Sequence, residues 1–197
     1  RHPRVQVAVL ETARGGLLRR GLALAGADVG AVTNVSDDHL GEWGVHDRAD
    51  MAWAKLGIAA GVRPGGALVV HGRDDAIGLE LAAHPPDGLR LRRFADAPRS
   101  ADLDGWIEDG ALWVRGASGP ERLLAEAEVP ITLSGTVRFM VDNALCAALV
   151  GLELGLGVAA VRAGLRAFAP DPDLSRGRLN RFTLPAGWVE KEAYGPG

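Results

Sequence analysis

The chain has 197 residues, of which 47% are hydrophobic and 24% charged, and its formal net charge is −3. This composition is ordinary for a globular domain, and the weak negative charge gives no electrostatic basis for binding nucleic acid or an anionic membrane. The single cysteine, Cys146, excludes an internal disulfide, and its apolar neighbours predict a buried structural thiol. The sequence shows no signal-peptide pattern and no apolar stretch of the ~20 residues that a membrane span needs, so we expect a cytoplasmic protein.

The first half of the chain alternates strand and helix patterns. Continuous apolar runs predict buried strands at residues 5–10, 29–33 and 67–70, with a turn at Pro64-Gly65-Gly66 before the third. Helical patterns occur at residues 17–24, 47–60 and 74–83, and Asp47 and Asp74 are suited to cap the last two. This order predicts an α/β fold, in which helices flank a mostly parallel sheet with right-handed crossovers.

The middle of the chain predicts a small antiparallel β extension. Residues 89–94 alternate, and Asp109-Gly110 separates strand-like runs at 105–108 and 111–114 as in a hairpin, which residues 122–129 extend. Helical patterns follow at residues 137–154 and 158–168, and then a linker-like stretch at 170–177. Residues 178–184 and 187–189 have the pattern of the first strands of another unit. We therefore predict one domain over residues 1–176 and the start of a second, incomplete domain over residues 177–197.

Polar side chains follow two of the predicted strands. Glu11 comes directly after the run at 5–10. The run at 29–33 is followed by Asn34, Asp37, Asp38 and His39. Because ligands gather at the carboxyl ends of the strands in open α/β sheets, these two ends predict one composite site.

Each candidate residue also has a structural alternative. Glu11 is either a Mg²⁺ ligand or a charge that interacts with the dipole of the following helix. His39 is either a ligand or an ordinary loop histidine, and one of the neighbouring aspartates can cap the turn that follows. Lys55 either extends to solvent or supplies positive charge at a phosphate site. Arg14-Gly15-Gly16 is either a simple turn or a place where the backbone approaches a phosphate.

Several common catalytic motifs are missing from the sequence. It contains no G-x-x-x-x-G-K-[ST] motif, no cysteine or histidine cluster with zinc-site spacing, and no G-x-S-x-G nucleophile elbow. The residues by themselves therefore predict a metal and phosphate site of undetermined purpose.

Two blocks of the sequence resemble a known family. Residues 11–22 (ETARGGLLRRGL) and 27–45 (ADVGAVTNVSDDHLGEWGV), with Lys55 behind them, resemble the central domain of the Mur ligase superfamily, in its cyanophycin synthetase branch. The resemblance covers residues 5–182 and continues through residues 129–132, 141–145, 164–168 and 177–180.

The resemblance implies an ATP- and Mg²⁺-dependent ligase that joins a carboxylate to an amine through an acyl phosphate. The implied partners are ATP, an amino acid and a peptide-like carboxylate acceptor; in this branch they are arginine and an aspartate-containing polymer. No nucleic acid or membrane partner is expected, and a homo-oligomer is compatible with the family. Both steps build negative charge on oxygen atoms, which favours Mg²⁺ and fixed cations.

The resemblance also implies a role for each matching residue. Glu11 and His39 would hold Mg²⁺, and His39 and Lys55 would be the catalytic residues. In several family members the matching lysine carries a carbamate that bridges to the metal. ATP would be bound by Asn143 at the adenine, by Arg178 at the phosphates, and by Arg14, Thr33 and Asn34 around the phosphate site.

Some features depart from the family pattern. Family members carry a P-loop on a strand upstream of the first block, and these residues do not include it. Met140 stands where the peptidoglycan-building members have asparagine, and Gly72-Arg73-Asp74-Asp75 lacks an expected asparagine. Residues 190–197 lack the D-Y-x-H-N-P motif that opens the C-terminal domain. We therefore expect the 197 residues to be an incomplete piece of a longer protein and to be inactive alone.

Two other functions fit the same residues. One is a non-catalytic Mur-like module that binds a nucleotide or a partner protein, and a G-x-[ST]-G-K-[ST] motif before Arg1 would favour the enzyme over it. The other is a phosphotransferase that uses the same metal site, and phosphate release that depends on an added amine would exclude it.

Overall fold

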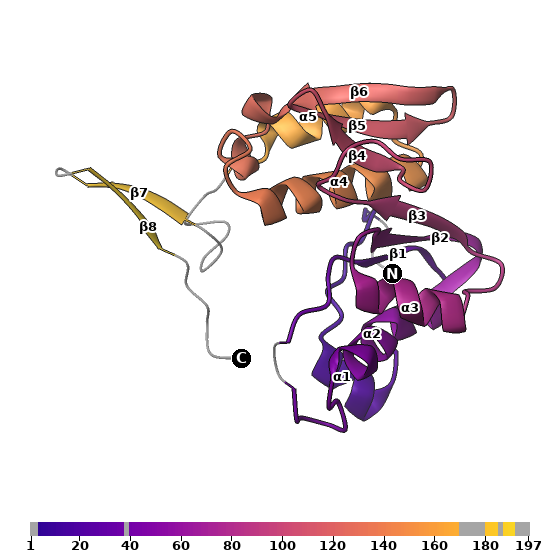
Figure 1. Cartoon of the computed structure of the whole chain (residues 1–197). Helices are drawn as coiled ribbons and strands as arrows, with labels where there is room; N and C mark the ends of the chain where they lie inside the picture. Colours follow the sequence, from indigo (N-terminus) through magenta and orange to yellow (C-terminus); the bar gives the residue numbers. More distant parts are fainter. Residues whose placement is uncertain (1–3, 38–39, 170–179, 185–186, 192–197) are drawn as a thin grey trace. The chain divides into compact units, whose positions relative to one another are not determined.

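The computed structural model describes residues 4–37, 40–169, 180–184 and 187–191 (Figure 1). The chain divides into two compact units, Arg1–Arg93 and Phe94–Gly197. The hydrogen-bonding order of the main sheet is β1-β2-β3-β4-β5-β6, and β7 pairs with β8 in a separate two-stranded sheet.

The first unit is built from alternating helices and strands, as the sequence predicts. Its elements are α1 (Arg14–Arg20), β1 (Ala27–Val32), α2 (Arg48–Leu56), the 3₁₀ turn η1 (Gly57–Gly61), β2 (Val62–His71), α3 (Asp75–Ala83) and β3 (Arg90–Phe94). Strands β1 and β2 run parallel, with Gly30 opposite Leu68 and Val32 opposite Val70. The predicted strands at residues 29–33 and 67–70 are therefore confirmed, and the structure shows that they are neighbours in the sheet.

Two aspartates fix the starts of the helices in this unit. The Asp47 side chain accepts a hydrogen bond from the backbone N–H of Asp50, in the first turn of α2. The Asp74 side chain accepts from the N–H groups of Ala76 and Ile77, in the first turn of α3. Both caps are confirmed, because each carboxylate satisfies N–H groups that have no partner within the helix.

The core of the first unit joins the sheet to helices α2 and α3. Val32, Leu68 and Val70 from the two strands are buried against side chains of these helices. The helix side chains in this core are Met51, Ala52, Leu56, Ala76, Ile77 and Leu81. Burial of one apolar face of each helix on the strands therefore holds the unit together.

The predicted strand at residues 5–10 is wrong in this structure. These residues form no strand, and the side chains of Val5, Val7, Val9 and Leu10 are 56%, 59%, 89% and 59% exposed. The following helix α1 begins at Arg14 instead of Leu17, and ends at Arg20. A strand exists only when a neighbour pairs with it, and no described residue pairs with this segment.

The predicted turn at Pro64-Gly65-Gly66 lies inside strand β2 as an irregularity. The register of β1 with β2 jumps from the pair Ala27 and Val62 to the pair Val29 and Ala67. Gly65 has a φ of +74°, and a Cβ on Gly66 would come 2.8 Å from the carbonyl oxygen of Asp28. The glycines thus let β2 absorb extra residues without leaving the sheet.

The second unit contains the antiparallel extension. Its strands are β4 (Gly105–Glu108), β5 (Ala111–Gly116) and β6 (Gly119–Ala125), and Phe94 pairs with Gly105 in the parallel sense. Asp109 and Gly110 have φ values of 49° and 66°, which a type I′ hairpin turn requires, and β4, β5 and β6 pair antiparallel. The sheet is therefore mixed, with the predicted antiparallel part in place.

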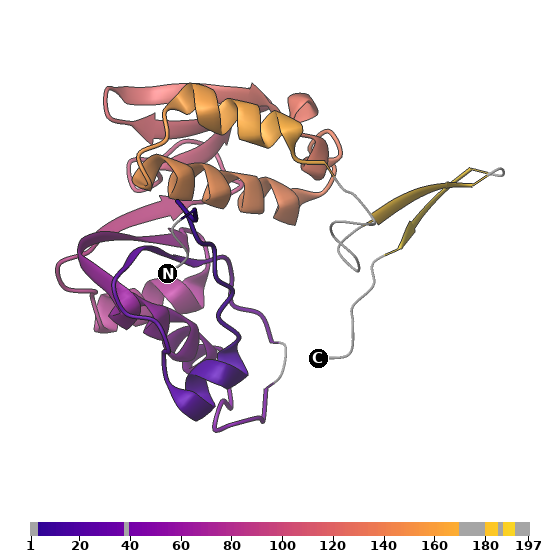
Figure 2. The same ribbon diagram turned by 180° about the vertical axis from the view of Figure 1, so that it is seen from behind.

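Two helices cover strands β4, β5 and β6 (Figure 2). Helix α4 (Arg138–Glu153) packs on β4 and β5, and helix α5 (Val158–Ala167) packs on β6. Cys146 of α4 is 5% exposed, and burial, together with the Asp142 charge, raises the pKa of its thiol to about 12. The predicted structural role of this thiol is confirmed.

Three successive residues before α4 have left-handed backbones. The φ values of Leu133, Ser134 and Gly135 are 49°, 59° and 80°. Two contacts hold this turn: the N–H of Gly135 donates to the buried Thr132 Oγ1, and Arg138 Nη1 donates to the Gly135 carbonyl at 2.9 Å. The left-handed region is unfavourable for side chains with a Cβ, so Leu133 and Ser134 are strained positions.

A short hairpin lies near the end of the chain. Strands β7 (Asn180–Leu184) and β8 (Gly187–Lys191) pair antiparallel, with Phe182 opposite Val189. These strands agree with the patterns at residues 178–184 and 187–189. The predicted domain boundary between residues 176 and 177 stays a prediction.

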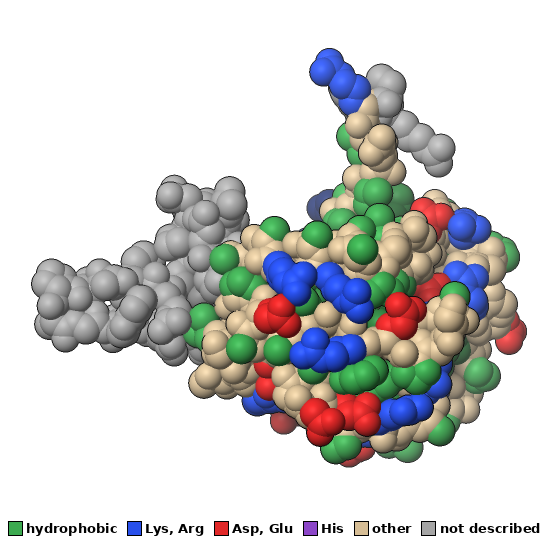
Figure 3. All heavy atoms as spheres, turned by 90° about the horizontal axis from the view of Figure 1, so that it is seen from above, with side chains coloured by type: hydrophobic (Ala, Val, Ile, Leu, Met, Phe, Trp, Pro, Cys, Tyr) green, Lys and Arg blue, Asp and Glu red, His purple; other side chains and the backbone are tan. Residues whose placement is uncertain are grey.

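Charged side chains of both signs lie interspersed on the face shown in Figure 3. That face therefore carries no basic stripe of the kind that follows a nucleic acid backbone. None of the helices in the described residues has the length and apolar character that crossing a membrane requires.

The left-handed turn predicts a stabilising substitution. Ser134→Gly should raise the free energy of unfolding by about 0.5–1 kcal/mol, because glycine adopts a positive φ without the steric cost that serine has there. Urea denaturation followed by far-UV circular dichroism measures the change. Ser118→Gly, at an exposed turn residue without a positive φ, is the matched control and should lower stability. A Ser134→Gly protein less stable than the parent would contradict the proposed strain.

Candidate functional site

Two polar residues lie directly after the carboxyl end of strand β1. Thr33 and Asn34 follow Val32 directly, and both side chains are exposed. The Thr33 hydroxyl lies 3.4 Å from Asn34 Oδ1. The predicted placement of these two residues at the end of a strand is confirmed, although only Gly30 and Val32 of β1 are buried. Their role in binding ATP stays a prediction.

Lys55 reaches the same place from helix α2. Its Nζ donates to the carbonyl oxygen of Asn34 at 2.9 Å, although the two residues are 21 positions apart in the sequence. Lys55 lies in the last turn of α2, where a cation also interacts favourably with the helix dipole. The structure therefore brings together Asn34 and Lys55, two of the sequence-predicted site residues, beside the end of β1.

After β1, both backbone polar groups of Val35 are hydrogen-bonded to side chains of other elements. The N–H of Val35 donates to Asp74 Oδ2 at 2.7 Å, and the carbonyl of Val35 accepts from Arg48 Nη2 at 3.2 Å. Arg48 Nη2 also lies 3.5 Å from Asp74 Oδ1, and the Asp74 side chain is only 6% exposed. The backbone after Asn34 is thus fixed by α2 and α3 together.

Arg14 makes an ion pair instead of standing free at the start of α1. Its Nη2 lies 2.9 Å from Glu42 Oε2, and the Arg14 side chain is 12% exposed. One turn further along, the Arg19 guanidinium stacks over the Trp43 ring at 4.6 Å from its centre. Helix α1 is therefore fastened to residues 42–43, and the predicted contact of Arg14 with phosphates is not tested by this arrangement.

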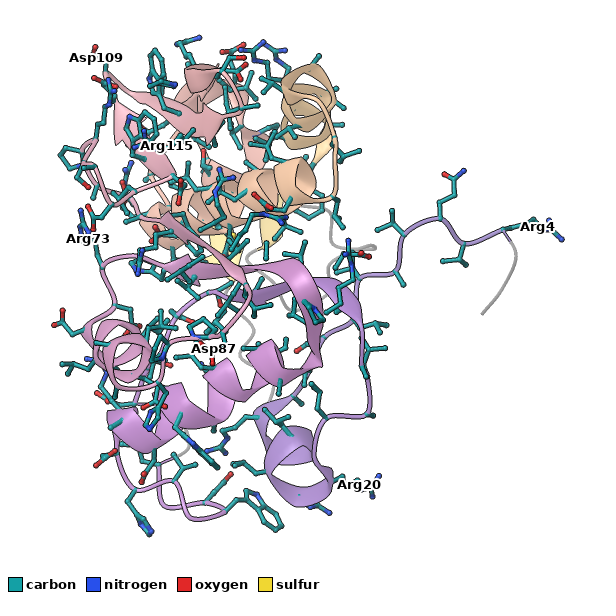
Figure 4. All side chains as sticks on the ribbon, turned by 90° about the vertical axis from the view of Figure 1, so that its right-hand side faces the viewer. Arg4, Arg20, Arg73, Asp87, Asp109 and Arg115 are labelled. Carbon is teal, nitrogen blue, oxygen red and sulfur yellow. The ribbon has the colours of Figure 1, made fainter. Side chains whose placement is uncertain are left out.

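Glu11 lies in the exposed segment before α1, and Figure 4 shows this segment leading from Arg4 towards the helix. Its carboxylate is a suitable oxygen ligand for Mg²⁺, which takes one or two carboxylates together with phosphates and water. In the described part of the chain, no group of three or more His, Cys, Asp or Glu side chains could hold a metal. Asp38, His39 and Arg178 lie outside the described residues, so the predicted pairing of Glu11 with His39 stays a prediction.

The second unit contains a separate cavity between α4 and α5. Its volume is about 450 Å³, and its walls are mostly small or apolar side chains such as Ala147, Gly151 and Phe168. Asn143 is the polar residue in this lining. Its Nδ2 donates to Met140 Sδ at 3.6 Å, and a thioether sulfur is a weak acceptor. An apolar cavity with a few polar groups is typical of sites for small-molecule ligands.

Sequence reasoning missed the residues that hold the end of β1. Asp74 was recognised as a helix cap, but its second oxygen also binds Val35 across 39 positions. Arg48 and Glu42 carried no signal in the sequence, because their partners are fixed only by the fold.

Residues 1–151 of this chain, which contain all six strands of the main sheet, match the Mur ligase middle domain. The chain belongs to the Mur ligase family. The resemblance of residues 11–22 and 27–45 to this family is thereby confirmed.

Relatives of known name are ligases. A cyanophycin synthetase of Synechocystis sp. is 36% identical over 193 residues, which are 93% of this chain and 22% of that protein. A UDP-N-acetylmuramoyl-tripeptide–D-alanyl-D-alanine ligase of Mycobacterium bovis is 32% identical over 176 residues, which are 87% of this chain and 32% of that protein. The chain therefore spans between 22% and 32% of the length of these Mur-type relatives.

The fold agrees with solved Mur ligase structures. MurF from Acinetobacter baumannii superposes with a TM-score of 0.61 at 21% identity, over 86% of this chain and 34% of that chain. The mixed sheet with flanking helices is thus the fold of a Mur ligase central domain, as the sequence predicts.

Removal of the Asp74 carboxylate should loosen the end of β1. Asp74→Ala leaves three backbone N–H groups without their acceptor, so we expect a loss of about 2–3 kcal/mol in the free energy of unfolding. Thermal and urea denaturation measure it. Asp75→Ala is the control, because this exposed residue contributes only its interaction with the helix dipole, a few tenths of a kcal/mol. Equal losses in the two variants would contradict the role of Asp74.

Proposed function

We propose that this chain is the central part of an ATP- and Mg²⁺-dependent ligase that joins a peptide-like carboxylate to the amine of an amino acid. The family membership supports the reaction class, since both named relatives are ligases. The observation that carries the proposal for this chain is the hydrogen bond from Lys55 Nζ to Asn34 at the end of β1. This hydrogen bond would put a cation near the carboxyl ends of the strands, where open α/β sheets bind their ligands.

The proposed reaction has two steps. The acceptor carboxylate attacks the γ-phosphorus of ATP, so that a new O–P bond forms, ADP leaves and an acyl phosphate results. The nitrogen of the amino acid then attacks the acyl carbon; inorganic phosphate leaves, and the nitrogen loses a proton as the amide forms. Negative charge develops on oxygen in both steps, and a fixed cation at this position stabilises it.

The residues of the first unit would act on the phosphates. In this proposal Lys55 holds positive charge beside the transferred group, and Thr33 and Asn34 form the floor of the site. Glu11 and His39 would hold Mg²⁺, which when bound neutralises phosphate charge and orients the phosphoryl group. Arg14 and Arg178 would contribute further contacts to ATP. The resemblance to the cyanophycin synthetase branch implies arginine as the amine and an aspartate-containing polymer as the acceptor.

The cavity of the second unit would take the adenine. Its apolar walls suit the faces of a flat ring, and the Asn143 side chain supplies one donor and one acceptor for the ring edge. The weak acceptor Met140 Sδ gives up the Asn143 amide at little cost when a better acceptor arrives.

The proposal is tested with the full-length natural protein, by measuring phosphate released from ATP with and without added amino acids. We expect release that requires both a carboxylate acceptor and an amine, with mass gain of the acceptor by one amide-linked residue. Release independent of any amine would indicate a phosphotransferase, and nucleotide binding without turnover would indicate a non-catalytic module.

Loss of the proposed cation or metal ligand should abolish turnover without unfolding the protein. Lys55→Met and Glu11→Gln should each lower kcat at least 100-fold, because both act on charge that develops in the transition state. Asp87→Asn, an acidic residue of the same unit outside the proposed site, is the control and should keep full activity. Circular dichroism checks the fold of each variant. Activity within tenfold of the parent in Glu11→Gln would remove Glu11 from the mechanism.

Asn143 should affect nucleotide binding more than chemistry. Asn143→Leu should raise the KM for ATP about tenfold, the cost of one lost hydrogen-bond pair, while kcat changes less. Steady-state kinetics at varied ATP concentration separate the two constants. Leu156→Val, which also alters the cavity wall but leaves the amide in place, should change KM by less than the Asn143 variant does. A pure loss of kcat would place Asn143 elsewhere in the mechanism.

A further inference from the structure

The first residue of helix α4 is held by two carboxylates from other parts of the second unit. Arg138 donates through Nε and Nη2 to the two oxygens of Asp96, which lies shortly after the end of β3. Its Nη1 donates at 2.9 Å to Oε1 of Glu126, at the start of the 3₁₀ turn η2 (Glu126–Glu128) that follows β6. These three residues, called the Arg138 cluster here, therefore tie the start of α4 to the ends of two strands.

The Arg138 cluster is fixed in orientation as well as in distance. The Asp96 and Glu126 side chains are 18% and 16% exposed, so water replaces their hydrogen bonds poorly. Hydrogen bonding to Asp96, and next to Glu126, raises the pKa of the Arg138 guanidinium above its usual range, although partial burial acts in the opposite direction. A planar guanidinium that meets a carboxylate through two nitrogen atoms allows only one relative orientation of the two groups.

Asp96 holds α4 at a second point, one helical turn further along. Its backbone N–H donates to Asp142 Oδ1 at 2.6 Å. Arg138 and Asp142 are four residues apart and therefore lie on the same face of the helix. Because both are bound to the same residue, the contacts fix the rotation of α4 about its own axis as well as its position.

The start of α4 lacks the usual contacts of a helix start. In residues 132–141, all of which the structure describes, no side chain caps the helix at Val137, and its first turn contains no acidic residue. The left-handed turn before the helix lies directly against the cluster, since a Cβ on Gly135 would come 2.5 Å from Glu126 Oε2. The Arg138 cluster thus takes the place of a cap at this end of the helix.

A different side of the same helical turns lines the cavity of the second unit. Met140 and Asn143 belong to its wall, whereas Arg138 is not among the described residues that line it. A helix turns by about 100° per residue, so Asn143 lies about 140° around the axis from Arg138. A small rotation of α4 would therefore move the Asn143 amide relative to α5, which lies beside α4 (Figure 2) and forms the other wall.

We propose that Arg138 is a positioning residue for this cavity, and that its pair with Asp96 sets the orientation in which the Asn143 amide meets the adenine of ATP. The inference rests on the proposed nucleotide site and adds the residues that keep that site in shape. Loss of the two-nitrogen contact leaves the amide present but less firmly oriented, so the affinity for ATP falls more than kcat does.

A double-mutant cycle tests whether Arg138 acts through Asn143. The Kd for ATP is measured by isothermal titration calorimetry on the full-length natural protein with Arg138→Lys, Asn143→Leu, both or neither. Lysine keeps the charge but lacks the planar two-nitrogen contact, so Arg138→Lys should raise the Kd about fivefold in the parent. In the Asn143→Leu background it should raise the Kd less than about twofold, because the group through which it acts is gone. The kcat should change less than about twofold.

A second variant removes the same pair from its other side. Asp96→Asn keeps the backbone N–H that binds Asp142 and should give the same pattern of Kd values in the two backgrounds. Arg166→Lys is the control and should keep the parent Kd. Arg166 Nη2 donates to Glu128 Oε1 at 2.6 Å, and a lysine can also make a contact through one nitrogen. Circular dichroism and thermal unfolding check that each variant is folded.

Two results would overturn the inference and leave the proposed nucleotide site in place. One is a Kd equal to that of the parent in both Arg138→Lys and Asp96→Asn. The other is the same loss of affinity with and without Asn143, which would make the ion pair a general stabiliser of the unit. An Asn143→Leu protein that binds ATP as tightly as the parent would instead overturn the proposed adenine site, and this inference with it.

Discussion

The carboxylate of Asp74 is the contact on which the arrangement at the end of β1 depends. One oxygen caps helix α3, and the other binds the N–H of Val35 at 2.7 Å. Arg48 from α2 completes the arrangement by binding the carbonyl of the same residue. Because the side chain is almost fully buried, its hydrogen bonds are poorly replaced by water. The position of Asn34, and of the Lys55 amine that it binds, follows from this one carboxylate.

Features decided by nearby residues could be predicted from the sequence. The caps at Asp47 and Asp74 and the turn at Asp109-Gly110 follow from local hydrogen bonding and backbone preference. The strand at residues 5–10 could not be predicted correctly, because its valines favour a strand while pairing depends on a neighbour that no local pattern describes. The turn predicted at residues 64–66 instead lies inside strand β2 as an irregularity, because whether a glycine ends a strand or bulges it depends on the partner strand.

In the candidate site too, some features follow from nearby residues and others from tertiary structure. Placement of Thr33 and Asn34 after a buried strand required only the apolar run before them. The family resemblance assigned Lys55 and Asn34 to one site, but it did not predict their hydrogen bond, because 21 positions separate the two residues in the sequence. The pairing of Arg14 with Glu42 is set by tertiary structure, and no spacing in the sequence indicates it. Membership in the Mur ligase family supports the proposed reaction class, which no single side chain here could establish.

The neighbour of Asn143 has a consequence for ligand discrimination. The thioether sulfur of Met140 is a weak acceptor, so its bond restrains the Asn143 carboxamide less than a bond to an oxygen would. An oxygen partner at that point would hold the amide in one orientation and so favour one arrangement of donor and acceptor on an incoming ring. With a thioether there, the amide is held less firmly in one orientation. If the proposed adenine site is correct, the fit of the cavity walls would then contribute more than the amide to discrimination between purines.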